Sequence, residues 1–260
     1  AAAELAGKRA QPAVTAGPSG LDQARMAAPG LIRQGSDQHG AWLDCRLDDR
    51  WHRFRPVRDQ HGDPLFWLAA RECDRALWAA MTGADPVTGA DGGQPITRIS
   101  WQQAVDACTA LDARLPTLQL RLPEVAEWRQ AARRLLAQTE PPLDCHDNLA
   151  DQDSGFPWRL RRWQDDHPHG PAPVQHHPVD AGGLANLAGN VAEWCLPDES
   201  KGLANQSARP YCGGSWADDW HRSRQQRVLA AGDATTTIGF RLAIAAQSPA
   251  FAGRPPLEQP

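Results

Sequence analysis

The 260-residue sequence contains no run of 18 or more apolar residues, so no segment of it is predicted to span a membrane. Residues 1–14 lack the apolar stretch of a secretory signal peptide. These absences favour a cytoplasmic protein and leave the compartment open. The formal net charge is −4, so the basic excess typical of nucleic-acid-binding proteins is also missing. We therefore expect no nucleic-acid partner.

The sequence also lacks any pair of cysteines separated by two residues, which excludes zinc ribbons and thioredoxin-like redox motifs. Its six cysteines are scattered at positions 45, 73, 108, 145, 195 and 212. This spacing agrees equally well with three disulfides and with six buried thiols.

Tyrosine occurs once and phenylalanine five times, against eleven tryptophans, 22 glycines and 22 prolines. This composition is typical of a compact fold with many loops and argues against a helical bundle. Residues 1–30 are rich in Ala, Gly and Pro and are predicted to form a mobile arm or linker, with a short helix near Leu21–Met26. A domain is expected over residues 31–246, followed by a disordered tail over 247–260.

Short strands are predicted early in this domain, as an antiparallel meander over residues 42–47, 52–57 and 65–73. A further short strand is predicted over Ile96 to Ser100. Three helices are expected as well. Asp74 can cap the first, which Gly83 can end, and Ser100 can cap the second, which starts at Trp101. The third should begin with Pro123 and continue to about residue 136.

The segment Asn186–Trp194, NLAGNVAEW, combines hard oxygen ligands on Asn186 and Glu193 with a glycine that permits a tight bend. Such a loop suits Ca²⁺, although it could equally be an asparagine-rich turn leading into a strand. Four histidines at 167, 169, 176 and 177 lie among prolines without the spacing of a helical metal motif, so we expect them at the surface.

Three segments occur in a fixed order: RLPEVAEWRQAAR (121–133), NLAGNVAEW (186–194) and a stretch from GGSW to GFRL (213–242). As a set they resemble the signature of the formylglycine-generating-enzyme/sulfatase-modifying-factor domain family. The resemblance covers roughly residues 60–246. It implies an α+β fold of the C-type-lectin-like kind, with short antiparallel strands, two or three helices and much irregular loop.

The resemblance also implies structural calcium. One site would be formed by Asn148, the carbonyl of Leu149 and Asp166. The other would be formed by the side chains of Asn186 and Glu193 with the carbonyls of Gly189 and Val191. The ions would brace the long irregular stretch over residues 139–185.

The resemblance does not extend to the residues that bind the catalytic metal in this family. Formylglycine-generating enzymes hold copper with two thiolates after the GGS segment, and those positions here are Asp218 and Ser223. The His-x₃-His-x-Glu motif of the non-haem iron branch is absent from the sequence. We therefore expect neither copper nor iron. An oxidoreductase of either type remains the alternative to a non-catalytic protein.

A binding surface is predicted over residues 216–237, which mix aromatic and adaptable polar side chains. The candidates for ligand contact are Trp216, Asp218, Asp219, Trp220, His221, Arg222, Arg224 and Gln225. The layout also resembles variable proteins of diversity-generating retroelements, whose mutagenised segment lies between similar end motifs. The partner would be a protein or a small molecule of unknown identity.

Overall fold

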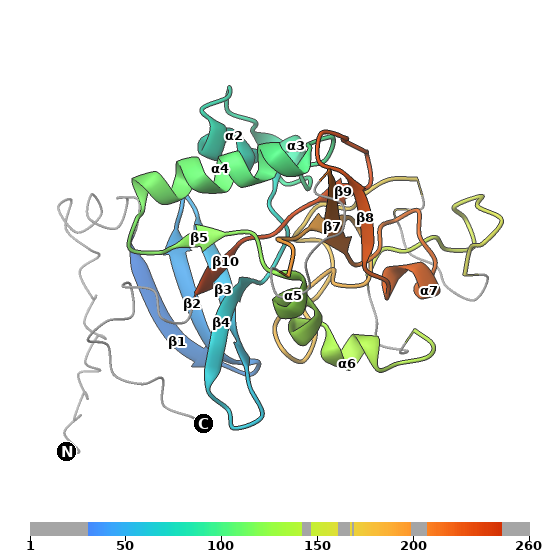
Figure 1. The fold of residues 1–260 in the computed structure, drawn as a ribbon, viewed down its shortest axis with the longest axis horizontal. Helices are drawn as coiled ribbons and strands as arrows, with labels where there is room; N and C mark the ends of the chain where they lie inside the picture. Colours follow the sequence, from blue (N-terminus) through green and yellow to red (C-terminus); the bar gives the residue numbers. More distant parts are fainter. Residues whose placement is uncertain (1–30, 142–146, 161–166, 168, 199–206, 246–260) are drawn as a thin grey trace, which may run out of the picture.

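The computed structural model describes residues 31–141, 147–160, 167, 169–198 and 207–245 (Figure 1). The predicted arm, its short helix and the predicted tail lie outside these residues. Within them, the structure is of the α+β class with extensive irregular loops, as predicted. None of the helices in the described part of the chain has the length and apolar character needed to cross a membrane.

The larger sheet has six strands, each antiparallel to its neighbours. In spatial order they are β1 (Ile32–Asp37), β2 (Gly40–Arg46), β3 (Trp51–Arg58), β4 (Pro64–Ala69), β10 (Ala243–Ala245) and β5 (Leu120–Arg121). The predicted meander is therefore confirmed as β2, β3 and β4, and β1 extends it at one edge. Strand β10 pairs with β4, so the last described segment is held beside the first part of the domain.

Two helices, α2 (Arg75–Thr82) and α4 (Trp101–Arg114), pack against this sheet, and α4 lies across its upper end in Figure 1. The predicted caps are present. The side chain of Asp74 accepts from Leu77 N over 2.8 Å, and that of Ser100 accepts from Gln103 N over 3.2 Å. Gly83 ends α2 in the left-handed region, at φ 73°. The apolar faces of both helices join the sheet in the largest core cluster.

The third predicted helix is broken into α5 (Val125–Ala131) and α6 (Arg133–Leu136), because Ala132 leaves the helical conformation at ψ 5°. Pro123 precedes α5 instead of starting it, since Glu124 is the N-cap. The strand predicted over residues 96–100 was wrong: this segment is irregular. Two helices of four residues each were not predicted: α3 (Gly89–Gly92) and α7 (Trp220–Ser223).

The smaller sheet consists of β8 (Arg227–Ala230), β7 (Ala208–Cys212), β6 (Ala192–Trp194) and β9 (Ile238–Gly239), in that order. Strands β6 and β9 run parallel, and the other pairs are antiparallel. Long irregular segments from residues 147–160 and 169–191 pack around this sheet, at the end of the domain opposite β1 (Figure 1).

The five cysteines in the described part of the chain are buried free thiols, which decides between the two alternatives for them. Cys145 lies outside that part. Burial raises the pKa of the Cys108 thiol well above its ordinary value, so this side chain behaves as a small apolar residue.

Candidate ligand-binding surface beside α7

The loop that contains Asn186–Trp194 is the frame for this end of the molecule. Asn186 and Asn190 both adopt left-handed conformations, at φ 59° and 66°, which asparagine tolerates better than most residues. Gly189 lies directly against the segment before it: a Cβ here would lie 2.0 Å from the carbonyl oxygen of Asn148. Only glycine allows this approach, and it fixes the loop against residue 148.

Glu193 ends this loop with a buried charge. Its carboxylate accepts from Arg241 Nε over 2.7 Å at Oε2 and from Arg241 Nη2 over 2.5 Å at Oε1. The indole Nε1 of Trp128 donates to Oε2 over 2.8 Å. Both Glu193 and Arg241 are almost fully buried. Because Glu193 lies in β6 and Arg241 between β9 and β10, their ion pair links these two segments.

The two predicted calcium sets differ in how well they fit an ion. In the second set, both carboxylate oxygens of Glu193 are held by Arg241, and the Asn186 side chain bonds Glu72 and His177. These ligands do not fit Ca²⁺ in this arrangement. The carbonyls of Gly189 and Val191, the other members of this set, stay a prediction.

The first set fits better. Asn148 is fully buried, its Nδ2 donates to Gly170 O over 2.9 Å, and its Oδ1 has no hydrogen-bond partner. A buried amide oxygen of this kind is a hard ligand for Ca²⁺. Leu149 is buried beside it, whereas Asp166 lies outside the described residues. The calcium prediction therefore remains a prediction, with Asn148 as its best-placed residue.

The histidines do not all lie at the surface as expected. The rings of His167, His176 and His177 gather with centroids 4.5 to 6.4 Å apart. His177 is buried, and its Nδ1 lies 3.2 Å from Asn186 Oδ1. Within the described residues, no group of three or more His, Cys, Asp or Glu side chains has the arrangement of a metal site.

The positions that correspond to the copper thiolates are fully engaged in other contacts. The Asp218 carboxylate accepts from Arg227 Nη1 over 2.8 Å and from Ser215 Oγ over 2.8 Å. Ser223 Oγ is buried and donates to the carbonyl of Trp220 over 2.8 Å. Both side chains shape the turn around α7. Asp218 and Ser223 do not provide the soft ligands that copper(I) requires.

Three aromatic rings gather beside α7 and form what we call the aromatic platform: Phe156, Trp158 and Trp216. Phe156 stacks on Trp158 with a centroid distance of 5.1 Å, and it contacts Trp216 at 5.9 Å. Trp158 is 41% exposed. The guanidinium of Arg222 lies over its ring at 5.2 Å from the centroid. An exposed aromatic surface beside a half-exposed cation is a suitable site for a ligand.

The other predicted contact residues divide between the surface and the interior. Trp220 is only 4% exposed and packs against Leu149 and Ala188, so it is not the surface aromatic residue that the sequence suggested. The single turn of α7 directs Trp220 inwards. Among the other predicted contact residues, Asp219 caps α7 by accepting from Arg222 N, and Arg224 donates to Leu136 O over 3.0 Å. The exposed side chains of His221 and Gln225 bond one another over 2.8 Å.

Phe156 and Trp158 could not be assigned to this surface from the sequence, because they lie 64 and 62 residues before Trp220, the first residue of α7. Their signal was the segment FPW at 156–158, an apolar cluster within a polar loop. Trp158 Nε1 donates to Ala217 O over 2.9 Å, which attaches this loop to the predicted surface. The candidate site is thus the aromatic platform together with His221, Arg222 and Gln225.

Comparison with known proteins identifies the family of this chain. Residues 37–246 match the family described as the sulfatase-modifying factor enzyme 1-like domain. The chain belongs to this family. It is 29% identical over 211 residues to the inactive C-alpha-formylglycine-generating enzyme 2 of Bos taurus, covering 75% of this chain and 62% of that protein. It is 33% identical over 140 residues to the formylglycine-generating enzyme of Streptomyces coelicolor, covering 50% and 40%.

The chain therefore spans less than two thirds of the length of these relatives. Among solved structures, variable protein 1 of Treponema denticola is similar with a TM-score of 0.59 and 18% identity, covering 83% of this chain and 99% of that one. PvdO from Pseudomonas aeruginosa is similar with a TM-score of 0.55 and 16% identity, covering 84% and 99%. At these identities the two structures establish the shared fold alone.

Proposed function

We propose that this chain is a non-catalytic binding domain, which recognises a protein or small-molecule ligand through the aromatic platform and the exposed face of α7. One observation carries the proposal: Asp218 and Ser223 stand at the thiolate positions and are engaged in hydrogen bonds, while an exposed Trp158 and Arg222 lie beside them. The name of the bovine relative, an inactive formylglycine-generating enzyme, also supports a non-catalytic role.

The competing function, a copper or iron oxidase, is tested by its chemistry. The full chain is incubated with copper(I), and separately with iron(II), and oxygen uptake is followed with a cysteine-containing peptide as the probe. We expect no uptake above the protein-free rate. Stoichiometric metal with peptide-dependent oxygen uptake would overturn the proposal. A variant with Asp218→Cys and Ser223→Cys should bind one more copper(I) than the Ser223→Cys control, because thiolates are the ligands that are missing.

The binding role is tested by comparing captured partners. A partner taken up by the wild-type chain should be lost when Trp158→Ala and Arg222→Ala are combined, since both side chains of the exposed stack are removed. The control is Leu65→Ala, which truncates another exposed apolar side chain on β4. If the platform variant keeps the same partner with unchanged affinity, the surface lies elsewhere.

We further propose that the chain is a variable protein of a diversity-generating retroelement. The test is the DNA around the coding region. A second copy of the 216–237 segment should be present, differing from the first mainly at adenines. Substitutions should fall on exposed positions such as His221, Arg222 and Gln225, whereas the buried Asp218 and Trp220 should stay constant. Absence of such a copy would contradict the proposal of a retroelement variable protein. It would not affect the binding proposal, which the partner comparison tests separately.

We also propose that Ca²⁺ at the set containing Asn148 and the Leu149 carbonyl braces the loops beneath this surface. The unsatisfied Oδ1 of Asn148 supports this assignment. When bound, the ion would supply rigidity. Asn148 and Leu149 would hold it, and Gly189 would keep the neighbouring loop in place.

A further inference from the structure

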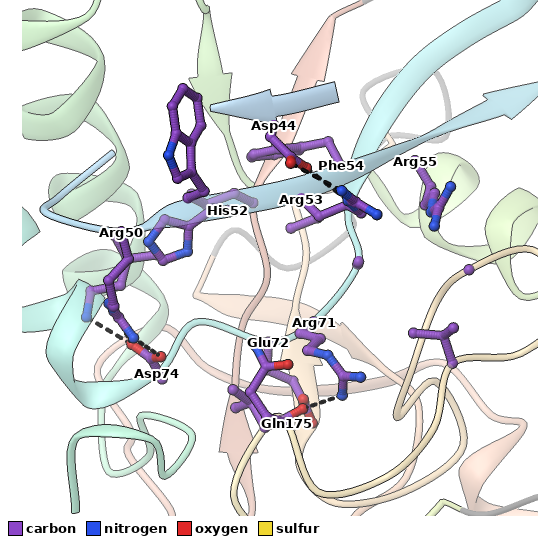
Figure 2. A pocket seen from close by; sticks show the side chains of 18 of the residues that line it. Asp44, Arg50, His52, Arg53, Phe54, Arg55, Arg71, Glu72, Asp74 and Gln175 are labelled. Atoms are coloured by element: carbon purple, nitrogen blue, oxygen red, sulfur yellow. Dashed lines mark hydrogen bonds and ion pairs between the residues drawn. The ribbon is translucent and has the colours of Figure 1, made fainter. Parts of the chain in front are cut away.

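A second potential site lies away from the aromatic platform. A pocket of about 620 Å³ opens between β3, the segment that follows β4, and the loop around Gln175. Figure 2 shows Arg53, Asp44 and Arg55 on one side, Arg71, Glu72 and Gln175 on the other, and Arg50 with Asp74 at one end. No residue of the platform or of α7 lines it. The pocket is therefore independent of the proposed binding surface.

The pocket is unusually rich in arginine, and nearly all of these arginines are neutralised by carboxylates. The ion pairs are Arg33 with Asp44, Arg50 with Asp48 and Asp74, Arg53 with Asp44 and Asp37, and Arg55 with Asp37. Their N–O distances are 2.7 to 3.0 Å. These pairs build a fixed polar wall and leave little charge for a ligand.

Arg71 is different. Its Nη1 donates to the backbone carbonyls of Val174 and of His177, the latter over 2.9 Å. Among the arginines that line the pocket, Arg71 alone has no carboxylate partner within the described residues. Its Nε and Nη2 groups make no hydrogen bond to any described residue. The backbone contacts therefore hold the guanidinium in place while its other edge remains available.

Glu72, the next residue in the chain, acts on Arg71 through its charge but forms no ion pair with it. The carboxylate of Glu72 accepts from Asn186 Nδ2 over 2.7 Å and from Asn190 Nδ2 over 3.0 Å, so it is directed to the asparagines. Adjacent Nε–H and Nη2–H groups form the planar pair of donors that matches the two oxygens of a carboxylate or a phosphate. An immobilised arginine of this kind needs little further ordering to bind an oxyanion.

We propose that this pocket binds a small organic molecule through an oxyanion, a carboxylate or a phosphate, held on the free edge of Arg71. The volume of about 620 Å³ is far larger than an inorganic ion and falls in the usual range for small-molecule sites. Trp51, Phe54 and Leu77 add apolar lining for the rest of the molecule. The exposed Gln175 stands beside Arg71 (Figure 2).

The test uses the full chain and two simple probes, inorganic phosphate and acetate, at an ionic strength held constant with sodium chloride. Binding is followed by NMR at the side-chain Nε–H of Arg71. We expect a saturable shift with at least one probe. Saturation by phosphate alone would identify a phosphate-bearing ligand, and saturation by acetate alone a carboxylate-bearing one. No saturable shift with either probe would overturn the proposal.

Variants assign the binding to Arg71. Because Arg71→Gln removes the resonance itself, affinities in the variant series are read from the backbone amides of residues 174 and 175. Arg71→Gln should weaken binding at least tenfold, whereas Arg75→Gln, an exposed arginine outside the pocket, should leave it unchanged. Gln175→Glu keeps Arg71 and its loop contacts but places a competing carboxylate beside it, and it should also weaken binding at least tenfold. This variant keeps the test valid if Arg71→Gln does not fold. Equal affinities for Gln175→Glu and wild type would overturn the proposal.

Discussion

The carboxylate of Glu193 and the guanidinium of Arg241 form a buried ion pair between residues 48 positions apart, with Nε 2.7 Å from Oε2. The guanidinium also donates to the carbonyls of Ala69 and Ala185. A single side chain thus connects the end of β4, the loop before β6 and β6 itself. The family motifs that contain Glu193 and Arg241 therefore join one another at the centre of the fold.

Replacing Glu193 with glutamine should lower the free energy of unfolding by about 3–5 kcal/mol, because the buried guanidinium of Arg241 would lose the carboxylate with which it forms an ion pair. Chemical denaturation measures the change. Glu127→Gln is the matched control, since the Glu127–Arg121 pair is partly exposed and should contribute only about 1 kcal/mol or less. Equal losses for the two variants would contradict the central role of the Glu193 pair.

Chelation should lower the melting temperature of the wild-type chain if Ca²⁺ binds at Asn148. The effect should disappear in Asn148→Ala, because the unsatisfied Oδ1 is the side-chain ligand that the structure presents. Glu193→Gln provides the comparison: it should melt at a lower temperature yet keep its response to EDTA, since Glu193 is occupied by Arg241. Identical melting curves of the wild type with calcium and with EDTA would contradict the proposed calcium site.

Glu72 should make stability depend on pH near neutrality. Burial raises the pKa of this carboxyl to about 7; Arg241 opposes the rise and Glu193 adds to it. The folded state therefore binds more protons than the unfolded state between pH 4.5 and 7, and the stability due to protonated Glu72 is lost as the pH rises through about 7. The loss can reach about 3 kcal/mol, at about 1.4 kcal/mol for each pKa unit.

The measurement is the unfolding free energy from pH 5 to 8 for the wild type and Glu72→Gln. The wild type should lose stability relative to the variant as the pH rises, whatever the absolute difference between them. Glu140→Gln, at an exposed position, should follow the wild-type profile. Parallel curves for wild type and Glu72→Gln would show that Glu72 does not titrate in this range.

Features set by local chemistry could be predicted from the sequence, whereas features that depend on distant contacts could not. The caps at Asp74 and Ser100 are contained within four residues, and both helices begin where these residues indicate. The break at Ala132 has no such local signal, because the spacing of apolar residues continues through it. The family motifs identified the fold, since they mark the segments that meet around Glu193 and Arg241.

The residues of the two candidate sites could not be identified from the sequence, because they are brought together only by the tertiary fold. Trp158 reaches the predicted surface only because its loop folds back to Ala217, and the sequence contains no periodic pattern there. Arg71 differs from its neighbouring arginines through its partners, which sequence spacing does not reveal. Trp220 lies between polar residues and was interpreted as exposed, yet one turn of helix is enough to bury it.

The contrast between Trp220 and Trp158 gives the sharpest test of this surface. Trp220→Ala should lower the free energy of unfolding by about 3–5 kcal/mol, because it leaves a cavity next to Leu149 and Ala188. Trp158→Ala removes a 41% exposed ring and should cost about 1 kcal/mol or less. Denaturant midpoints measure both changes, provided that the denaturant dependence of the unfolding free energy is unchanged. A large loss from Trp158→Ala with a small loss from Trp220→Ala would reverse their assignments, making Trp158 structural and Trp220 the candidate for ligand contact.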